Sequence, residues 1–169
     1  SWITSICGDG TARGKSDGVL FVPAISGLLA PHWKPNMTGS FHNLTLKTTK
    51  ENMVSAVYES IASSVADCIH MINSKIKLEK VHIDGGLSND EHLLQMIADC
   101  SGITLETSSI KERTALGIAK AAAETIGFSI IQDMKKHESI MITPNDNAEL
   151  SSTYEKWRIL MRNAIENHQ

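Results

Sequence analysis

Cysteine is scarce in this sequence, and its spacing excludes two classes of small cross-linked protein. The chain of 169 residues has three cysteines, Cys7, Cys68 and Cys100, which are widely separated and form no CxxC pair. An odd and dispersed set of this kind encodes neither a disulfide framework nor a zinc ribbon. We therefore expect a protein of a reducing compartment.

Long apolar runs and clustered charge are missing as well. No segment approaches the roughly 18 consecutive apolar residues that cross a bilayer, so we expect a soluble domain. The formal net charge is -3 and the basic residues are scattered, which excludes the basic surface that nucleic acids and anionic membranes require. The histidines are dispersed without ligand spacing, so no metal site is predicted, although His32 beside Trp33 lies in a distinctive loop.

Three segments are predicted along the chain. Residues 1–18 are expected to form a partial element followed by an exposed, glycine-rich loop. Residues 19–142 are expected to form the main domain, and residues 143–169 a turn and a C-terminal helix. Because the sequence starts with Ser1 in the middle of an apparent element, we expect it to be a piece of a longer protein.

Strands alternate with helices through the main domain, which predicts an α/β fold. A β-prone run at 19–22 leads into a long loop that extends to Gly39. Thr48 and Glu51 have the spacing of a capping box, and a long helix is predicted behind them by apolar residues at helical spacing: Val54, Val57, Tyr58, Ile61, Val65, Ile69, Ile72 and Ile76. The remaining predicted elements are strands at 81–83 and 103–106 and helices over 93–100, 114–126 and 154–165.

The segment that indicates chemistry is Ile83-Asp84-Gly85-Gly86, between a strand and a helix. Two successive glycines let the backbone approach a ligand closely, and the following helix offers unpaired amides, so the turn is able to hold a nucleotide. On these residues alone, such a turn is more often a matter of simple chain topology. Asp84 is expected either to face phosphate-bound Mg²⁺ or to cap nearby backbone amides, and capping is the favoured interpretation.

Longer motifs carry a family resemblance. The segments SGLLAPHWKPNMTG from Ser26, HIDGGLSND from His82 and ERTALGIAKAAAETIGF from Glu112 occur in an order that resembles the C-terminal domain of glycerol kinases, members of the FGGY carbohydrate kinase family. The resemblance runs collinearly from about Val19 to the helix that contains Trp157. It implies a ribonuclease H-like, actin-like ATPase fold, of which this chain is the C-terminal half of the second kinase domain.

The resemblance also implies an adenosine-binding loop. Gly85 and Gly86 are expected to lie against the adenosine and α-phosphate of ATP, with an Asn on the following turn near the adenine. Counted without gaps, the family's Asn position falls on Asp90, whereas this sequence has its Asn one residue earlier, at Asn89. Either side chain is a candidate for the adenine contact, and we assign Gly85, Gly86, Asn89 and Asp90 to the predicted site.

The loop after Ser26 departs further from the pattern of the resembled family. That family usually has Tyr, an acidic residue, Arg and Gly at the positions that here hold His32, Lys34, Thr38 and Asn43. These changes are compatible with altered oligomer or regulatory contacts, or with relaxed selection on a protein that no longer turns over substrate.

No catalytic residue is predicted within this chain. In the resembled family the phosphate-binding turns, the glycerol contacts and the catalytic aspartate all precede this region, and phosphoryl transfer needs Mg²⁺ and an oriented base. We expect ATP with Mg²⁺ as cofactor, held mainly by the missing part, glycerol as substrate, and an inactive isolated chain.

A nucleotide- or partner-binding pseudoenzyme and a purely structural fragment are the alternatives. By resemblance, a homo-oligomer is possible, and the location is the cytoplasm or the mitochondrial surface.

Overall fold

The strands form two small sheets. The structure is a computed structural model that describes residues 16–108, 113–127 and 139–167. In the first sheet, β1 (Leu20–Val22) pairs antiparallel with β2 (Ser40–His42). In the second, the order is β3-β4-β5, with β3 and β4 parallel and β5 antiparallel to β4. The strands of the second sheet are β3 (Lys80–His82), β4 (Thr104–Ser108) and β5 (Ser139–Ile142).

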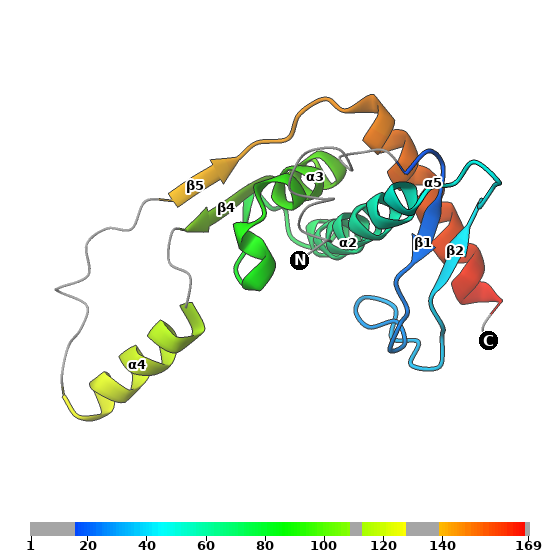
Figure 1. The fold of residues 1–169 in the computed structure, drawn as a ribbon. Coiled ribbons are helices and arrows are strands. Elements are labelled where there is room, and N and C mark those ends of the chain that lie inside the picture. Colours follow the sequence, from blue (N-terminus) through cyan, green and yellow to red (C-terminus); the bar gives the residue numbers. More distant parts are fainter. Residues whose placement is uncertain (1–15, 109–112, 128–138, 168–169) are drawn as a thin grey trace.

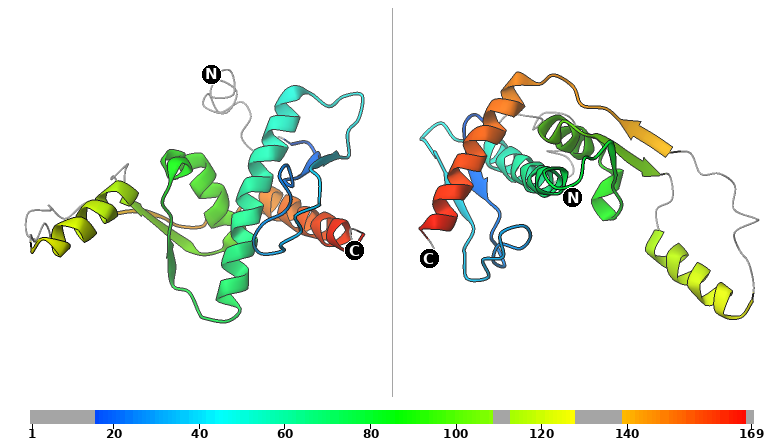
Figure 2. Two further views of the ribbon diagram at one scale, coloured as in Figure 1. Left: turned by 90° about the horizontal axis from the view of Figure 1, so that it is seen from below. Right: turned by 180° about the vertical axis from the view of Figure 1, so that it is seen from behind.

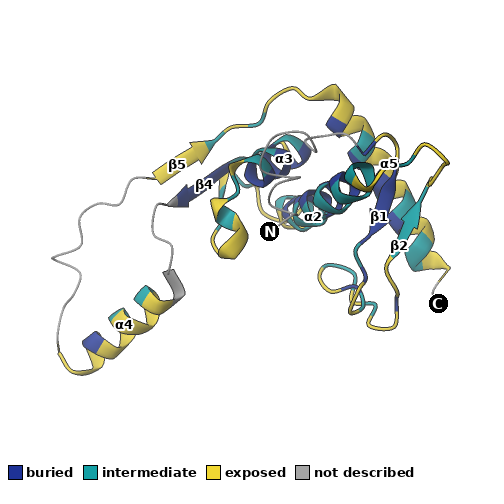
Figure 3. Ribbon diagram, in the orientation of Figure 1, coloured by how far each residue is buried: buried dark blue, intermediate teal, exposed yellow. Residues whose placement is uncertain are grey.

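One long helix separates the two sheets. Figure 2 shows α2 running between the β1–β2 hairpin on one side and α3 with the second sheet on the other. In Figure 1, α4 lies apart from the other elements, and Figure 3 shows that most of its surface is exposed. The helices are α2 (Lys50–Asn73), the 3₁₀ helix η1 (Gly86–Asn89), α3 (Glu91–Ser101), α4 (Arg113–Thr125) and α5 (Ala148–Glu166).

The start of α2 lies one residue later than the sequence predicts. Thr49 is the N-cap, its hydroxyl accepts from the Asn52 amide at 3.3 Å, and Asn52 Oδ1 accepts from the Thr49 amide at 2.9 Å. The predicted cap Thr48 instead accepts from the Thr45 amide at 2.8 Å. Thr48 and Thr49 each have a candidate partner for a capping box three residues ahead, Glu51 and Asn52, and the structure forms the box between Thr49 and Asn52.

Other boundaries differ where local patterns are weak. The α2 helix ends at Asn73, so Ile76, predicted inside the helix, follows it and is exposed. Strands β2 and β5 were not predicted, because the three and four residues of these strands are too short for a clear alternation. Of the predicted segment 1–18, residues 1–15 lie outside the described residues, and Ser16 is buried rather than exposed.

The main hydrophobic core joins α2, α3, α5 and β1. Its fully buried members include Leu93 and Leu94 of α3 and Met161 of α5. Trp157 of α5 is also buried, and its Nε1 donates to the Phe21 carbonyl oxygen of β1 at 2.8 Å. The C-terminal helix therefore packs into the same core as the strand at the other end of the described chain.

The loop between β1 and β2, residues 23–39, is held in its conformation by buried side chains and by backbone contacts within the loop. Leu28 and Met37 are buried, and Leu28 and Lys34 exchange two backbone hydrogen bonds of 2.9 and 2.7 Å. Gly27 has a φ of +80°, and a Cβ atom added there would lie 2.5 Å from the Pro35 carbonyl oxygen. The loop therefore folds back on itself so closely that only glycine fits at position 27.

Within the described ranges, no helix combines the length and apolar character that crossing a membrane would need.

Candidate functional site

The glycine turn follows β3 as the sequence predicts. Gly85 has φ +117° and ψ -179°, a conformation that only glycine adopts readily. The Gly85 amide donates to Asp84 Oδ1 at 2.8 Å. The Asp84 carboxylate therefore stabilises the turn by accepting from the amide of the next residue. Capping is therefore its role in this structure. A Cβ atom added at Gly85 or Gly86 would meet nothing within 4 Å, which leaves the approach to both backbones open.

The helix after the turn does not start where the glycines end. Residues Gly86–Asn89 form η1, and α3 begins only after Asp90. Asp90 is the N-cap of α3: its Oδ1 accepts from the Leu93 amide at 3.1 Å, and its Oδ2 accepts from the Tyr58 hydroxyl at 3.4 Å. One of the backbone amides expected to be unpaired at the start of α3 therefore already has an acceptor within the chain.

A pocket of about 320 Å³ opens beside η1, where the parallel strands β3 and β4 end. Crevices at the carboxyl ends of parallel strands are the usual ligand sites of open α/β sheets. The pocket is lined by Ser88, Asn89, Glu91, Leu94, Gln95, Thr107, Ile140 and Ile142. It therefore combines an apolar wall from three aliphatic side chains with polar groups from the turn and α3.

Among those polar groups, Asn89 stands out. The Gln95 amide donates to Asp99 and to the Thr143 carbonyl oxygen, and the Ser88 hydroxyl donates to the Gly85 carbonyl oxygen. Across residues 16–108, 113–127 and 139–167, the Asn89 side chain has no hydrogen-bond partner of this kind. Its amide can therefore both donate to and accept from a ligand in the pocket.

The structure separates the two candidate side chains that the sequence left equivalent. Asn89 lines the pocket, whereas Asp90 points into the packing between α2 and α3. Sequence reasoning missed the apolar wall from Ile140 and Ile142, which lie more than 50 residues beyond the turn. The run Ile140-Met141-Ile142 was the only available signal for it.

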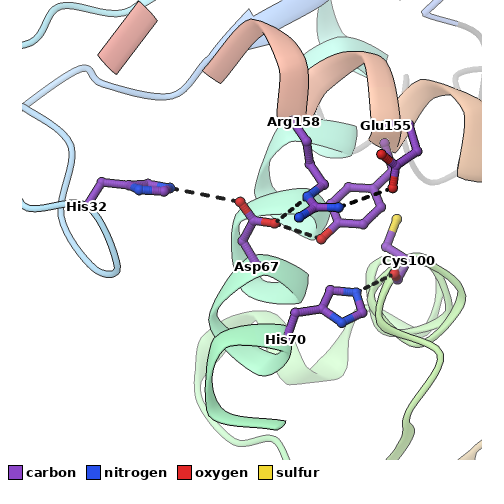
Figure 4. Close-up of polar contacts among 7 residues, drawn as sticks. His32, Asp67, His70, Cys100, Glu155 and Arg158 are labelled. Carbon is purple, nitrogen blue, oxygen red and sulfur yellow. Dashed lines mark hydrogen bonds and ion pairs between the residues drawn. The ribbon is translucent and has the colours of Figure 1, made fainter. Parts of the chain in front are cut away.

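A second polar cluster surrounds Asp67 of α2, far from the glycine turn in sequence. Figure 4 shows Arg158 of α5 and His32 of the 23–39 loop directed at its carboxylate. The hydroxyl of Tyr154, also in α5, donates to the same carboxylate at 2.7 Å. Beside this cluster, His70 Nε2 lies 3.2 Å from the Cys100 carbonyl oxygen. Burial raises the pKa of the Cys100 thiol to about 12, so it remains protonated and unreactive near neutral pH.

The described part of the chain offers no ligand set for a metal ion. No group of three or more His, Cys, Asp or Glu side chains converges there. Asp84, the carboxylate nearest the glycine turn, is hydrogen-bonded to its own neighbour.

Known proteins are similar in sequence to this chain. Residues 10–125 match the family described as the FGGY family of carbohydrate kinases, C-terminal domain. A glycerol kinase of Rippkaea orientalis is 42% identical over 113 residues, covering 66% of this chain and 23% of that protein. A glycerol kinase of a Synechocystis species is 40% identical over 120 residues, covering 70% of this chain and 24% of that protein. The chain thus spans less than a third of the length of these relatives.

The fold is shared as well. The crystal structure of Plasmodium falciparum glycerol kinase with ADP matches with a TM-score of 0.74 at 24% sequence identity. The match covers 96% of this chain and 33% of that protein, so it includes almost every element described above.

Proposed function

Because this chain belongs to the FGGY family of carbohydrate kinases, as its C-terminal domain, we propose that it forms the nucleotide side of an ATP-dependent glycerol kinase. Its fold is the actin-like ATPase fold of that family. The reaction would convert ATP and glycerol into ADP and glycerol 3-phosphate, in the cytoplasm. The observation that carries the proposal is the 42% identity to a glycerol kinase over 113 residues that include the glycine turn.

The described residues fit the adenosine part of ATP. Gly85 and Gly86 leave open space beside their backbones, where a sugar or an α-phosphate can approach. The aliphatic wall of the neighbouring pocket suits the face of a purine. A carboxamide such as that of Asn89 can donate to one ring nitrogen and accept from the amino group of adenine. We assign the adenine contact to Asn89, and to Asp90 the supporting role of holding the first turn of α3.

Catalysis itself is assigned to the part of the protein outside this chain. The γ-phosphoryl group needs Mg²⁺ to offset its developing charge and a base to orient the attacking hydroxyl. The described residues gather no group of three or more His, Cys, Asp or Glu side chains to hold the metal ion. In the resembled family, the aspartate that acts as the base precedes the region of this chain. This chain would bind and orient the nucleoside, and the isolated chain would not turn over glycerol.

The second candidate is a nucleotide-binding protein of the same fold without turnover. It is favoured by the one-residue displacement of the Asn and by the altered 23–39 loop. The curated relatives that match this chain at about 40% identity are glycerol kinases, so the kinase remains the preferred proposal.

The test measures ATP-dependent glycerol phosphorylation by the full-length protein and by two variants, Gly86→Ala and Gly86→Asp. A Cβ atom at Gly86 meets nothing within 4 Å in the described chain, so the Ala variant introduces no clash. We expect the wild type to be active, the Ala variant to lose little activity and the Asp variant to need at least tenfold more ATP, because a carboxylate there repels phosphate. Absence of turnover in a folded protein that still binds ADP would favour the second candidate.

A further inference from the structure

The apolar wall of the pocket beside η1 belongs to a strand at the edge of its sheet. Among the described residues, β5 pairs with β4 alone. Ile142 lies opposite the fully buried Leu105, whereas Ile140 lies opposite Thr107 and is 46% exposed. Residues that face each other across an antiparallel pair share one side of the sheet, so both isoleucines lie on the side where α3 packs. The position of this wall therefore depends on how firmly β5 is held.

Two side chains of α3 hold the segment that follows β5. Gln95 Nε2 donates at 2.9 Å to the carbonyl oxygen of Thr143, the residue after the strand. The backbone amide of Asn145 donates to Asp99 Oδ1 at 2.8 Å. In Figure 1, the chain leaves β5 and runs past α3 toward α5. Gln95 and Asp99 therefore fasten this segment to α3 directly beyond the apolar wall.

The two side chains also hold each other. Gln95 Nε2 donates to Asp99 Oδ1 at 2.7 Å. Residues four apart on a helix lie on the same face, so α3 presents both groups to the linker at once. A carboxylate is a strong acceptor, and the same oxygen of Asp99 accepts from Gln95 and from the Asn145 amide. The contacts thus form one connected network between α3 and the end of β5.

Gln95 belongs to the pocket as well as to this network. Its side chain lines the pocket with Asn89, Ile140 and Ile142. Its amide nitrogen carries two hydrogens, and both already have acceptors within the chain. Gln95 therefore contributes its apolar stem to the pocket, and its nitrogen fixes the spacing between α3 and β5. Asp99 is not one of the lining residues and acts through its partners.

We propose that Gln95 and Asp99 are positioning residues that hold the wall formed by Ile140 and Ile142 against the base of a bound nucleotide. The proposal rests on the proposed function, because it takes this pocket as the adenine site. A purine gains from the wall only where the two surfaces touch. When the network is broken, the end of β5 moves away from α3 and the wall loses contact with the base. The residues that carry out phosphoryl transfer, assigned above to the part outside this chain, are unaffected.

The experiment compares the full-length protein with two variants by ADP titration and by the kinetics of glycerol phosphorylation. Gln95→Met keeps an apolar stem of similar length and removes both donors, whereas Asp99→Ala removes the shared acceptor. Each should raise the Kd of ADP and the KM for ATP about three- to tenfold, the range of one lost hydrogen bond. The kcat and the KM for glycerol should stay within about twofold of wild type, because only nucleotide binding is changed.

Three further variants separate positioning from general loosening of the fold. The double variant Gln95→Met/Asp99→Ala should bind ADP about as weakly as the weaker single variant, because both changes break one network. Asp99→Asn keeps an acceptor oxygen and should recover most of the affinity. His70→Phe removes a contact between α2 and the Cys100 carbonyl oxygen that lies outside the network, and it should leave the Kd of ADP unchanged.

The outcomes distinguish this proposal from the kinase proposal. An ADP Kd that is unchanged in both single variants, a lower kcat with an unchanged Kd, or effects that add in the double variant would overturn the positioning role. If the wild type binds ADP without phosphorylating glycerol, the kinase proposal fails, and the ADP titrations still decide the role of Gln95 and Asp99. A folded wild type that binds no ADP would overturn both proposals.

Discussion

Replacing Gly27 by Ala tests how tightly the 23–39 loop is folded on itself. The added Cβ would lie 2.5, 2.8 and 2.9 Å from the carbonyl oxygen, Cα and carbonyl carbon of Pro35. These are backbone atoms, so they cannot rotate away as a side chain would. The left-handed φ of +80° costs about 1 kcal/mol for a non-glycine residue. Relief of the overlap costs about 2 kcal/mol more, so the total is about 3 kcal/mol.

Gly18 provides a matched control in the same chain. Its φ of +81° is nearly identical to that of Gly27, and a Cβ atom there would meet nothing within 4 Å. Gly18→Ala therefore carries the backbone cost alone, about 1 kcal/mol. The difference between the two variants isolates the contact with Pro35.

The assay is urea unfolding followed by circular dichroism, with linear extrapolation of the free energy of unfolding. With a slope of about 2 kcal/mol/M, the midpoint of Gly27→Ala should fall about 1 M below that of Gly18→Ala. Equal midpoints for the two variants would refute the reasoning, because they would show that residues 27 and 35 do not approach as closely as described.

Three further predictions concern the pocket and the core. In a titration of the full-length protein, Asn89→Ala should weaken ATP binding about tenfold. Asp90→Ala should mainly lower the free energy of unfolding, by about 1 kcal/mol. Weaker ATP binding in Asp90→Ala and lower stability in Asn89→Ala would contradict our assignment. Burial raises the pKa of Glu59 above its usual 4.5, so the charged carboxylate destabilises the fold as the pH rises. In urea titrations, Glu59→Gln should therefore have a higher free energy of unfolding than wild type at pH 7, and this advantage should vanish toward pH 4.5. A difference in free energy that stays constant with pH would contradict this. Trp157→Phe, which removes the donor to the Phe21 carbonyl oxygen, should cost about 2 kcal/mol by the same assay, and an unchanged midpoint would argue against that hydrogen bond.

Sequence patterns predicted the fold wherever an element was long and regular. Apolar spacing placed α2 and α3 in the right order, and the strand before the glycine turn lies within one residue of its predicted position. The short strands β2 and β5 were missed because each is defined by its pairing partner, which a single segment does not reveal.

The candidate site was predictable only in part. The positive φ of Gly85 agrees with a glycine that the turn requires, and the motif alone placed the turn after a strand. The division of roles between Asn89 and Asp90 depends on Tyr58, a residue of another helix. Local sequence patterns do not reveal a contact between two separate helices. The same applies to His32 and Asp67, which are distant in sequence but lie close together in the structure.

The hydrogen bond between Trp157 and Phe21 also has a consequence for synthesis on the ribosome. The two residues are 136 positions apart, and β1 is made first. At about 5–20 residues per second, roughly 7 to 27 s pass between the translation of Phe21 and that of Trp157. During that interval the apolar side of β1 that α5 later covers has no permanent partner. The part of β1 that packs against α5 therefore stays uncovered in the nascent chain until α5 has been made.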